Sequence, residues 1–183
     1  MKNRLLVLIL QNVVLFPNQD VKLEFSNDIS KKIIEESIYG RDSELVLVSP
    51  KDKEGNVLSL ADIEDLGVLA KIKNSIEMPN GNLRVTLRGT KRVHLVDMKT
   101  LYSGLIEVEY EQTESTVYNL DEELTYTKKL KKLVDSYIDV NPECPVSLQG
   151  LIKNVTNLSK LSDMIAASLD FNIKDKNRLL KEV

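Results

Sequence analysis

The sequence has few of the residues that build disulfides, metal sites and catalytic triads. Its 183 residues include one cysteine, Cys144, and one histidine, His94. A lone cysteine cannot form an internal disulfide, and neither residue has the cysteine or histidine neighbours of a zinc site, so we expect no metal. A single cysteine fits the reducing environment of the cytoplasm, which is the location we predict.

The seven glycines are spread too thinly along the chain for a nucleotide-binding loop. None stands in the spacing of a P-loop or a dinucleotide fingerprint, so we expect no cofactor on this segment. His94 has no partner that would complete a catalytic triad. We therefore interpret His94 as structural, partly buried or at a strand edge, and Cys144, beside Glu143, as unreactive.

Neither a dominant charge nor a long apolar run is present. The 25 basic and 28 acidic side chains give a net charge of -3, so no overall field attracts nucleic acid or an anionic membrane. No apolar run approaches the roughly 20 residues that cross a bilayer, so we expect no membrane partner. Lys2 and Arg4 precede a short apolar run without a small-residue cleavage site, which predicts a β-strand and not a signal peptide.

The clearest pattern that is present predicts a β-hairpin over residues 66–96. Two arms with alternating apolar residues flank the Pro-Asn-Gly-Asn segment 79–82, and a period of two puts alternate side chains on opposite faces. Asn80-Gly81 predicts a tight primed turn, which needs positive φ angles. Gly89-Thr90 interrupts the second arm, so we expect a third strand from Val93. The predicted core residues of the hairpin are Val68, Ala70, Ile72, Leu83, Val85 and Leu87.

The rest of residues 1–112 contains more strand patterns and one helix pattern. Apolar or alternating segments predict strands over 5–10, 21–25, 45–48 and 101–110. A helix is predicted from an N-cap at Ser26-Asn27-Asp28 to Gly40, with Ile29, Ile33, Ile34 and Ile38 at helical spacing. Short connections favour an antiparallel, closed sheet. The predicted fold class is α+β, with a small antiparallel β-barrel and one helix in this first subdomain.

The pattern changes from strands to helices near residue 113. Residues 113–118 are polar and predict a linker, and residues 119–183 predict a helical bundle subdomain. Asn119 and Glu122 predict a capping box. Further helices are predicted at 148–155, 158–169 and from 172 onward, and the last reaches Val183 without a C-cap, so we expect the chain to be truncated at that end. The first helix carries an apolar stripe of Leu120, Leu124, Leu130, Leu133, Val134, Tyr137 and Ile138.

Two groups of charged residues are candidate sites. Asp62, Glu64 and Asp65 form a carboxylate cluster, which we interpret as a solvated loop before a strand. A basic face of the hairpin suits an RNA phosphate chain, but the hairpin lacks the aromatic residues on which bases stack. We therefore favour an ordinary solvated face. The basic residues are Lys71, Lys73, Arg84, Arg88, Lys91 and Arg92.

Four stretches of the sequence resemble the amino-terminal domain of Lon, the ATP-dependent protease family. The first is Val-Val-Leu-Phe-Pro at 13–17, and the second, residues 65–72, resembles the family's Val-Gly-Thr-Val-Ala stretch. The third, residues 79–93, resembles its Pro-Asp-Gly hairpin, which ends in Glu-Gly and a basic residue. The fourth, residues 161–180, is similar to the helical segment that closes the domain. Their common order along nearly the whole chain makes the resemblance specific.

This resemblance implies a PUA-like β-barrel followed by a helical subdomain, with a function in substrate recognition. In Lon proteases this domain helps to recognise unfolded or damaged proteins, delivers them to a ring of ATPase domains and contributes to homohexamer assembly. The family's Walker motif and serine-lysine dyad do not occur here, so the chain alone would not be an enzyme. ATP and magnesium would bind to the ATPase domain of the parent serine protease. For substrate contact we predict apolar residues near two turns: Ile76, Met78, Leu101 and Tyr102.

Two other functions remain open from the sequence. PUA-like folds commonly bind structured RNA, so a stand-alone RNA-binding barrel is one alternative, although nucleic acid is not our expected partner. Its affinity would fall steeply with salt. The other alternative is a protein adaptor with a Lon-type domain, which a natural gene ending near Val183 would favour.

Overall fold

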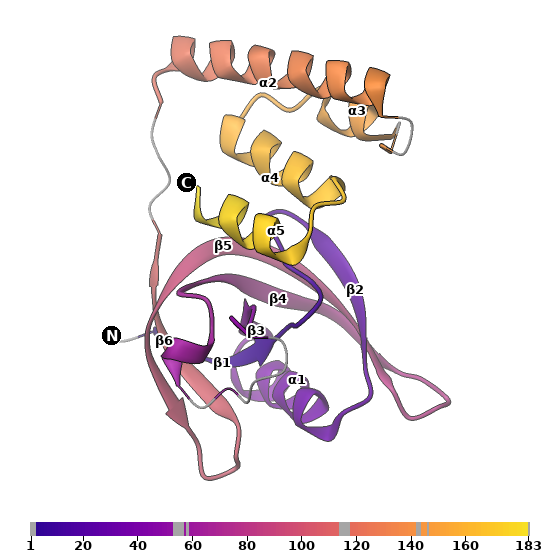
Figure 1. The fold of residues 1–183 in the computed structure, drawn as a ribbon. Coiled ribbons are helices and arrows are strands. Elements are labelled where there is room, and N and C mark those ends of the chain that lie inside the picture. Colours follow the sequence, from indigo (N-terminus) through magenta and orange to yellow (C-terminus); the bar gives the residue numbers. More distant parts are fainter. Residues whose placement is uncertain are drawn as a thin grey trace. The chain divides into compact units, whose positions relative to one another are not determined.

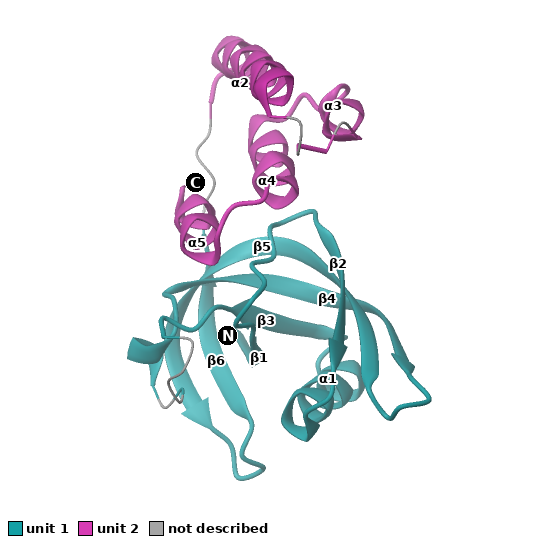
Figure 2. Cartoon of the chain, turned by 45° about the vertical axis from the view of Figure 1, so that its right-hand side comes forward, with its two compact units in different colours: residues 1–113 teal, residues 114–183 magenta. Residues whose placement is uncertain are grey.

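The computed structural model describes residues 3–52, 57, 59–113, 118–141, 144–145 and 147–182. Contacts between residues divide the chain into two compact units, residues 1–113 (unit 1) and residues 114–183 (unit 2) (Figure 2). Unit 1 holds the described strands and the first α-helix, and unit 2 holds four more α-helices. Residues 114–117 of the predicted linker lie outside the described residues.

Unit 1 is built on one six-stranded sheet (Figure 1). The strands follow the order β2-β5-β4-β3-β1-β6, and β6 also pairs with β5. The helix α1 (Asp28–Gly40) begins after the N-cap Asn27, whose side chain accepts a hydrogen bond from the Ser30 amide. A short 3-10 helix, η1 (Leu60–Asp62), precedes β4. The strands are β1 (Asn3–Ile9), β2 (Asp20–Phe25), β3 (Glu44–Val48), β4 (Leu66–Glu77), β5 (Leu83–Thr100) and β6 (Ile106–Gln112).

The sheet is mixed, and the prediction of a purely antiparallel sheet is therefore wrong. β1 and β3 run parallel, with Val7 opposite Val46, whereas the other strand pairs are antiparallel. The chain passes through β2 and α1 between these two strands, and a long connection of this kind allows parallel pairing. Because β6 pairs with β1 and with β5, the pairings lead back to β5. Pairing alone does not define a cylinder, so the barrel stays a prediction.

Apolar clusters on both faces of the sheet explain the uninterrupted apolar run of β1. Leu6 and Leu8 belong to the cluster that contains Ile34 of α1. Leu5 and Val7, which alternate with them, belong to a second cluster with residues of β5 and β6. Burying one such side chain stabilises the fold by about 1.5–3 kcal/mol. The cluster that contains Leu6, Leu8 and Ile34 therefore holds α1 against one face of the sheet.

The predicted hairpin is present as β4 and β5, but its second arm is one continuous strand. β5 runs for 18 residues and passes through Gly89, where a break was predicted. The segment before β2 lies directly against this glycine: the Asn18 amide donates to the Gly89 carbonyl, and the Gly89 amide donates to the Gln19 carbonyl, both at 2.9 Å. Gly89 therefore marks a close approach of two backbones and not a strand end.

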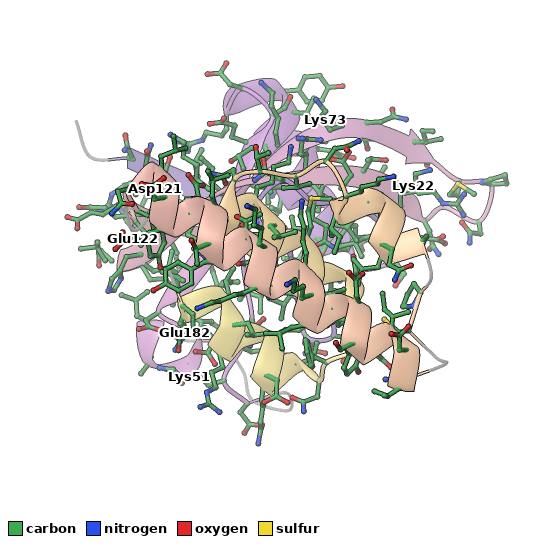
Figure 3. The ribbon with its side chains drawn as sticks, turned by 90° about the horizontal axis from the view of Figure 1, so that it is seen from above. Lys22, Lys51, Lys73, Asp121, Glu122 and Glu182 are labelled. Carbon is green, nitrogen blue, oxygen red and sulfur yellow. The ribbon has the colours of Figure 1, made fainter. Side chains whose placement is uncertain are left out.

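Unit 2 contains α2 (Leu120–Val140), α3 (Ser147–Ile152), α4 (Leu158–Ser168) and α5 (Ile173–Lys181). The predicted capping box is present, because the Asn119 side chain accepts from the Glu122 amide at 2.9 Å and the Asn119 amide donates to the Glu122 carboxylate at 3.3 Å. Asn172 caps α5 by accepting from the Asp175 amide. Asp121 and Glu122, labelled in Figure 3, lie in the first turn of α2, where acidic groups complement the helix dipole.

The apolar stripe predicted along α2 is buried only in part. Val134 is buried, and Leu130 and Ile138 pack against the same cluster as Leu148 of α3 and Leu161 of α4. These three residues lie in the second half of α2, which has 21 residues. None of the helices described here is long and apolar enough to cross a membrane. The stripe residues that are exposed are Leu120, Leu124, Leu133 and Tyr137.

Candidate functional site

The first of two similar turns in unit 1 joins β4 to β5. The Met78 amide donates to the Asn82 carbonyl, and the Gly81 amide donates to the Met78 carbonyl, both at 2.8 Å. Gly81 has a φ of 79°, but Asn80 is not among the residues with positive φ, so the predicted primed turn is wrong. The turn that forms instead runs from Met78 to Gly81 and has Pro79 in its second position, where an ordinary turn needs the φ near about -65° that the proline ring fixes.

The second turn joins β5 to β6 and has the same hydrogen bonds. The Leu101 amide donates to the Leu105 carbonyl at 2.8 Å, and the Gly104 amide donates to the Leu101 carbonyl at 2.9 Å. Gly104 has a φ of 82°, which glycine adopts without steric cost. The strand predicted over 101–110 therefore begins only at Ile106. Each turn starts with an apolar residue and has glycine in its fourth position.

The four predicted contact residues lie at these two turns, but they do not form one patch. Ile76, near the end of β4, is 51% exposed, and Tyr102 is fully exposed. Met78 and Leu101 are half-buried, and Leu101 packs against the core. Figures 1 and 2 show the two turns projecting from unit 1 on either side of α1. Each turn therefore presents one exposed apolar side chain.

The helix α1 bridges the two turns. It begins shortly after Phe25, whose partner in β5 is Leu83, the first residue after the first turn. At its other end, the Arg41 guanidinium donates to the Glu107 carboxylate at 2.7 Å, just after the second turn. A helix of 13 residues is about 20 Å long, which is the length of α1 between these two strands.

Two exposed residues of α1 were missed as site candidates. Ile29 is 65% exposed and Tyr39 is 89% exposed. Helical spacing had put Ile29 on the buried stripe, but it lies one turn before Ile33, outside the part of α1 that packs on the sheet. Tyr39 does not belong to the stripe of isoleucines at helical spacing, and this position in the sequence could have predicted its exposure. We define the tip surface as Ile29, Tyr39, Ile76 and Tyr102.

Acidic residues of β2 neutralise part of the basic face of the hairpin. Arg84 forms an ion pair with Glu24 at 3.3 Å, and Arg88 forms one with Asp20 at 3.2 Å. Glu24 also accepts a hydrogen bond from the Asn82 side chain at 2.7 Å. These contacts fasten β2 to β5 beside the first turn. They also weaken the field that a nucleic-acid phosphate chain would experience at these two arginines.

The Glu24 carboxylate gives a pH-dependent prediction. The hydrogen bond from Asn82, followed by that from Arg84, lowers the pKa of Glu24 below its usual 4.5. A carboxylate whose pKa is lowered by folding stabilises the folded state above its unfolded pKa, and this contribution is lost as pH falls through the folded pKa. We expect NMR titration of Glu24 to give a midpoint below 4.5, which Asn82→Ala moves upward. An unchanged midpoint in the variant would contradict the Asn82 contact.

The other candidate residues are not assembled into a catalytic or metal site within the described ranges. His94 is exposed and lies inside the sheet between Leu66 and Glu111, so its predicted position, partly buried or at a strand edge, is wrong. Cys144 is buried in the apolar core of unit 2. Asp62 accepts from the backbone at the start of η1. Across the described part of the chain, no group of three or more His, Cys, Asp or Glu residues is placed to hold a metal ion.

Solved structures of the same fold define the class of domain. The N-terminal domain of the Mycobacterium avium complex Lon protease has a TM-score of 0.71 over 97% of this chain and 96% of that chain, at 16% sequence identity. The Lon N-terminal domain protein from Xanthomonas campestris has a TM-score of 0.67 over 98% of this chain and 90% of that chain, also at 16% identity. The fold is that of Lon amino-terminal domains.

The sequence identifies the family. The model of the ATP-dependent protease La (LON) substrate-binding domain matches residues 4–183, and the chain belongs to this family, which confirms the resemblance predicted from four stretches. The Lon protease of Finegoldia magna is 31% identical over 183 residues, which are 98% of this chain and 24% of that protein. The Lon protease of Buchnera aphidicola subsp. Acyrthosiphon pisum is 27% identical over 176 residues, 96% of this chain. This chain covers 22% of that relative.

Proposed function

We propose that this chain is the non-catalytic substrate-recognition and assembly module of a Lon-type ATP-dependent serine protease in the cytoplasm. It binds unfolded or damaged proteins and delivers them to the ATPase ring of a homo-oligomeric parent, whose ATPase domain takes ATP and magnesium. Membership in the substrate-binding family supports protein binding in general. The tip surface supports the finer proposal, because its four apolar side chains are exposed. Folded proteins bury such side chains and unfolded proteins expose them.

The length of α1, which carries Ile29 and Tyr39 of the tip surface, suits an extended chain. A span of about 20 Å corresponds to roughly six residues of extended polypeptide. Partial burial of one apolar side chain contributes about 1 kcal/mol, so one module holds its substrate weakly. A ring of such modules raises the overall affinity through effective concentration. Weak individual contacts also let the chain move on to the ATPase domains.

An RNA-binding barrel and a protein adaptor are the alternatives. The adaptor would bind folded partners. The RNA alternative rests on the exposed lysines Lys71 and Lys73, since Arg84 and Arg88 already have acidic partners. The first test is binding of reduced, carboxymethylated α-lactalbumin, which cannot refold, in the presence and absence of an RNA hairpin. We expect binding that RNA does not displace; salt-sensitive RNA binding without binding of the unfolded protein would overturn the proposal.

A further inference from the structure

β2 pairs along one side only over its whole length. Residues 20–25 pair with residues 83–88 of β5, and within the described residues no other strand pairs with β2. Each of the other five strands pairs with at least two neighbours. Figure 1 shows β2 at the right-hand side of the sheet of unit 1. An unpaired edge presents amide and carbonyl groups that can pair with another extended chain.

The alternation of the ladder identifies the outward backbone groups. The Gly89 amide donates to the Gln19 carbonyl, and the Gly89 carbonyl accepts from the Asn18 amide, so Gln19 stands at a hydrogen-bonded position of the ladder, with its carbonyl toward β5. Such positions recur at every second residue of an antiparallel ladder. The odd-numbered residues of β2 therefore turn their backbone groups toward β5. Asp20, Lys22 and Glu24 turn theirs toward the free edge.

This edge has few of the features that protect edge strands. Proline, bulges and free charges usually block such edges. β2 contains no proline, and its register with β5 has no shift. Its two acids are held across the face of the sheet by ion pairs, Asp20 with Arg88 and Glu24 with Arg84. Lys22 is the remaining charged side chain, and it is exposed (Figure 3).

The side chains of β2 indicate which kind of strand could pair with its free edge. Val21 and Leu23 pack against the core cluster but are only half-buried. The exposed Ile29 follows β2 by a few residues, so apolar surface continues from the strand to α1. A further strand with alternating apolar residues would cover this surface. On its other face, an acidic side chain would complement Lys22.

We propose that β2 receives an extended segment of the unfolded protein as a seventh strand of the sheet. The segment has alternating apolar side chains that cover Val21 and Leu23, and an acidic side chain beside Lys22. This inference rests on the proposed function and specifies the class of segment that is bound. Main-chain hydrogen bonds hold the segment whatever its sequence, and the alternation gives a preference among segments.

The test compares Lys22→Pro with Lys22→Ala in the full chain, by fluorescence anisotropy of labelled reduced, carboxymethylated α-lactalbumin. Proline removes an outward amide that β5 does not use, and edge strands tolerate it there. We expect Lys22→Pro to weaken binding about tenfold and Lys22→Ala to weaken it by no more than about threefold. Circular dichroism verifies that both variants are folded. Equal binding by wild type and folded Lys22→Pro would overturn the inference.

Amide exchange provides a second readout on the unmodified chain. In NMR hydrogen-exchange measurements, the amides of Asp20, Lys22 and Glu24 should exchange more slowly when the unfolded protein is added. This readout decides the case if Lys22→Pro does not fold. Binding without added protection at these amides would overturn the edge inference and leave the proposed function intact. A wild-type chain that binds no unfolded protein would overturn both.

Discussion

Replacing Gly89 with alanine is expected to destabilise unit 1 by about 3 kcal/mol. A Cβ atom at this position would lie 2.2 Å from the Phe16 carbonyl oxygen and 3.3 Å from a Leu15 side-chain carbon. The Phe16 oxygen cannot simply move away, because the Phe16 side chain is fully buried and the backbones of Asn18 and Gln19, which follow it, are hydrogen-bonded to Gly89. The substitution therefore displaces a core residue or breaks the ladder.

Urea denaturation followed by the circular dichroism of the sheet measures this effect. The midpoint should fall without a large change in slope, and thermal unfolding should shift by roughly 10 °C or more. Gly40→Ala is the matched control, because a Cβ there meets nothing within 4 Å. It should leave stability unchanged or slightly increased. A loss below about 0.5 kcal/mol in Gly89→Ala would contradict the close approach at Gly89.

Replacing Ile76 and Tyr102 with serine together is expected to weaken binding of the unfolded protein at least tenfold, or about 1.4 kcal/mol. Both side chains are exposed at the turns, so their removal takes apolar area from the surface and little from the core. Each single variant should lose a part of this effect, since the two residues lie at different turns and contact different parts of an extended chain. Anisotropy with labelled reduced, carboxymethylated α-lactalbumin measures the loss.

Val96→Ser provides the control for this experiment. Val96 is 46% exposed, close to the 51% of Ile76, but it lies within β5 at an irregularity in the pairing with β6 and not at a turn. It should bind the unfolded protein like the wild type. Equal losses in Val96→Ser and in Ile76→Ser would show that any exposed apolar residue serves, and so would contradict the tip surface as the binding site.

Much of the fold could be predicted from the sequence, because many of its elements are determined by residues that are close together in the chain. The alternation in β2 and β4 and the capping box at Asn119 each depend on residues a few positions apart. The errors came from distant contacts. Gly89 stays within β5 because residues 16–19 pack on it, and the parallel direction of β1 and β3 cannot be read from apolar runs that are buried on both faces.

The candidate site was also predicted where nearby residues determine it and missed where distant contacts do. Apolar residues at turns indicated Ile76 and Tyr102, since turns lie at the surface and each residue can be located from the sequence alone. Periodicity shows which residues share a helix face, but not whether another element covers that face. For this reason the stripes that helical spacing predicted include Ile29 of α1 and Leu133 of α2, which are 65% and 67% exposed.

We propose that this domain distinguishes unfolded from folded protein. The most direct measurement uses one polypeptide in two states, native disulfide-intact α-lactalbumin and the same protein after reduction and carboxymethylation, each labelled and titrated with the full chain. We expect binding of the unfolded form, weakened by the double substitution at Ile76 and Tyr102, and no measurable binding of the native form. Equal binding of both forms, or negligible binding of either, would contradict it.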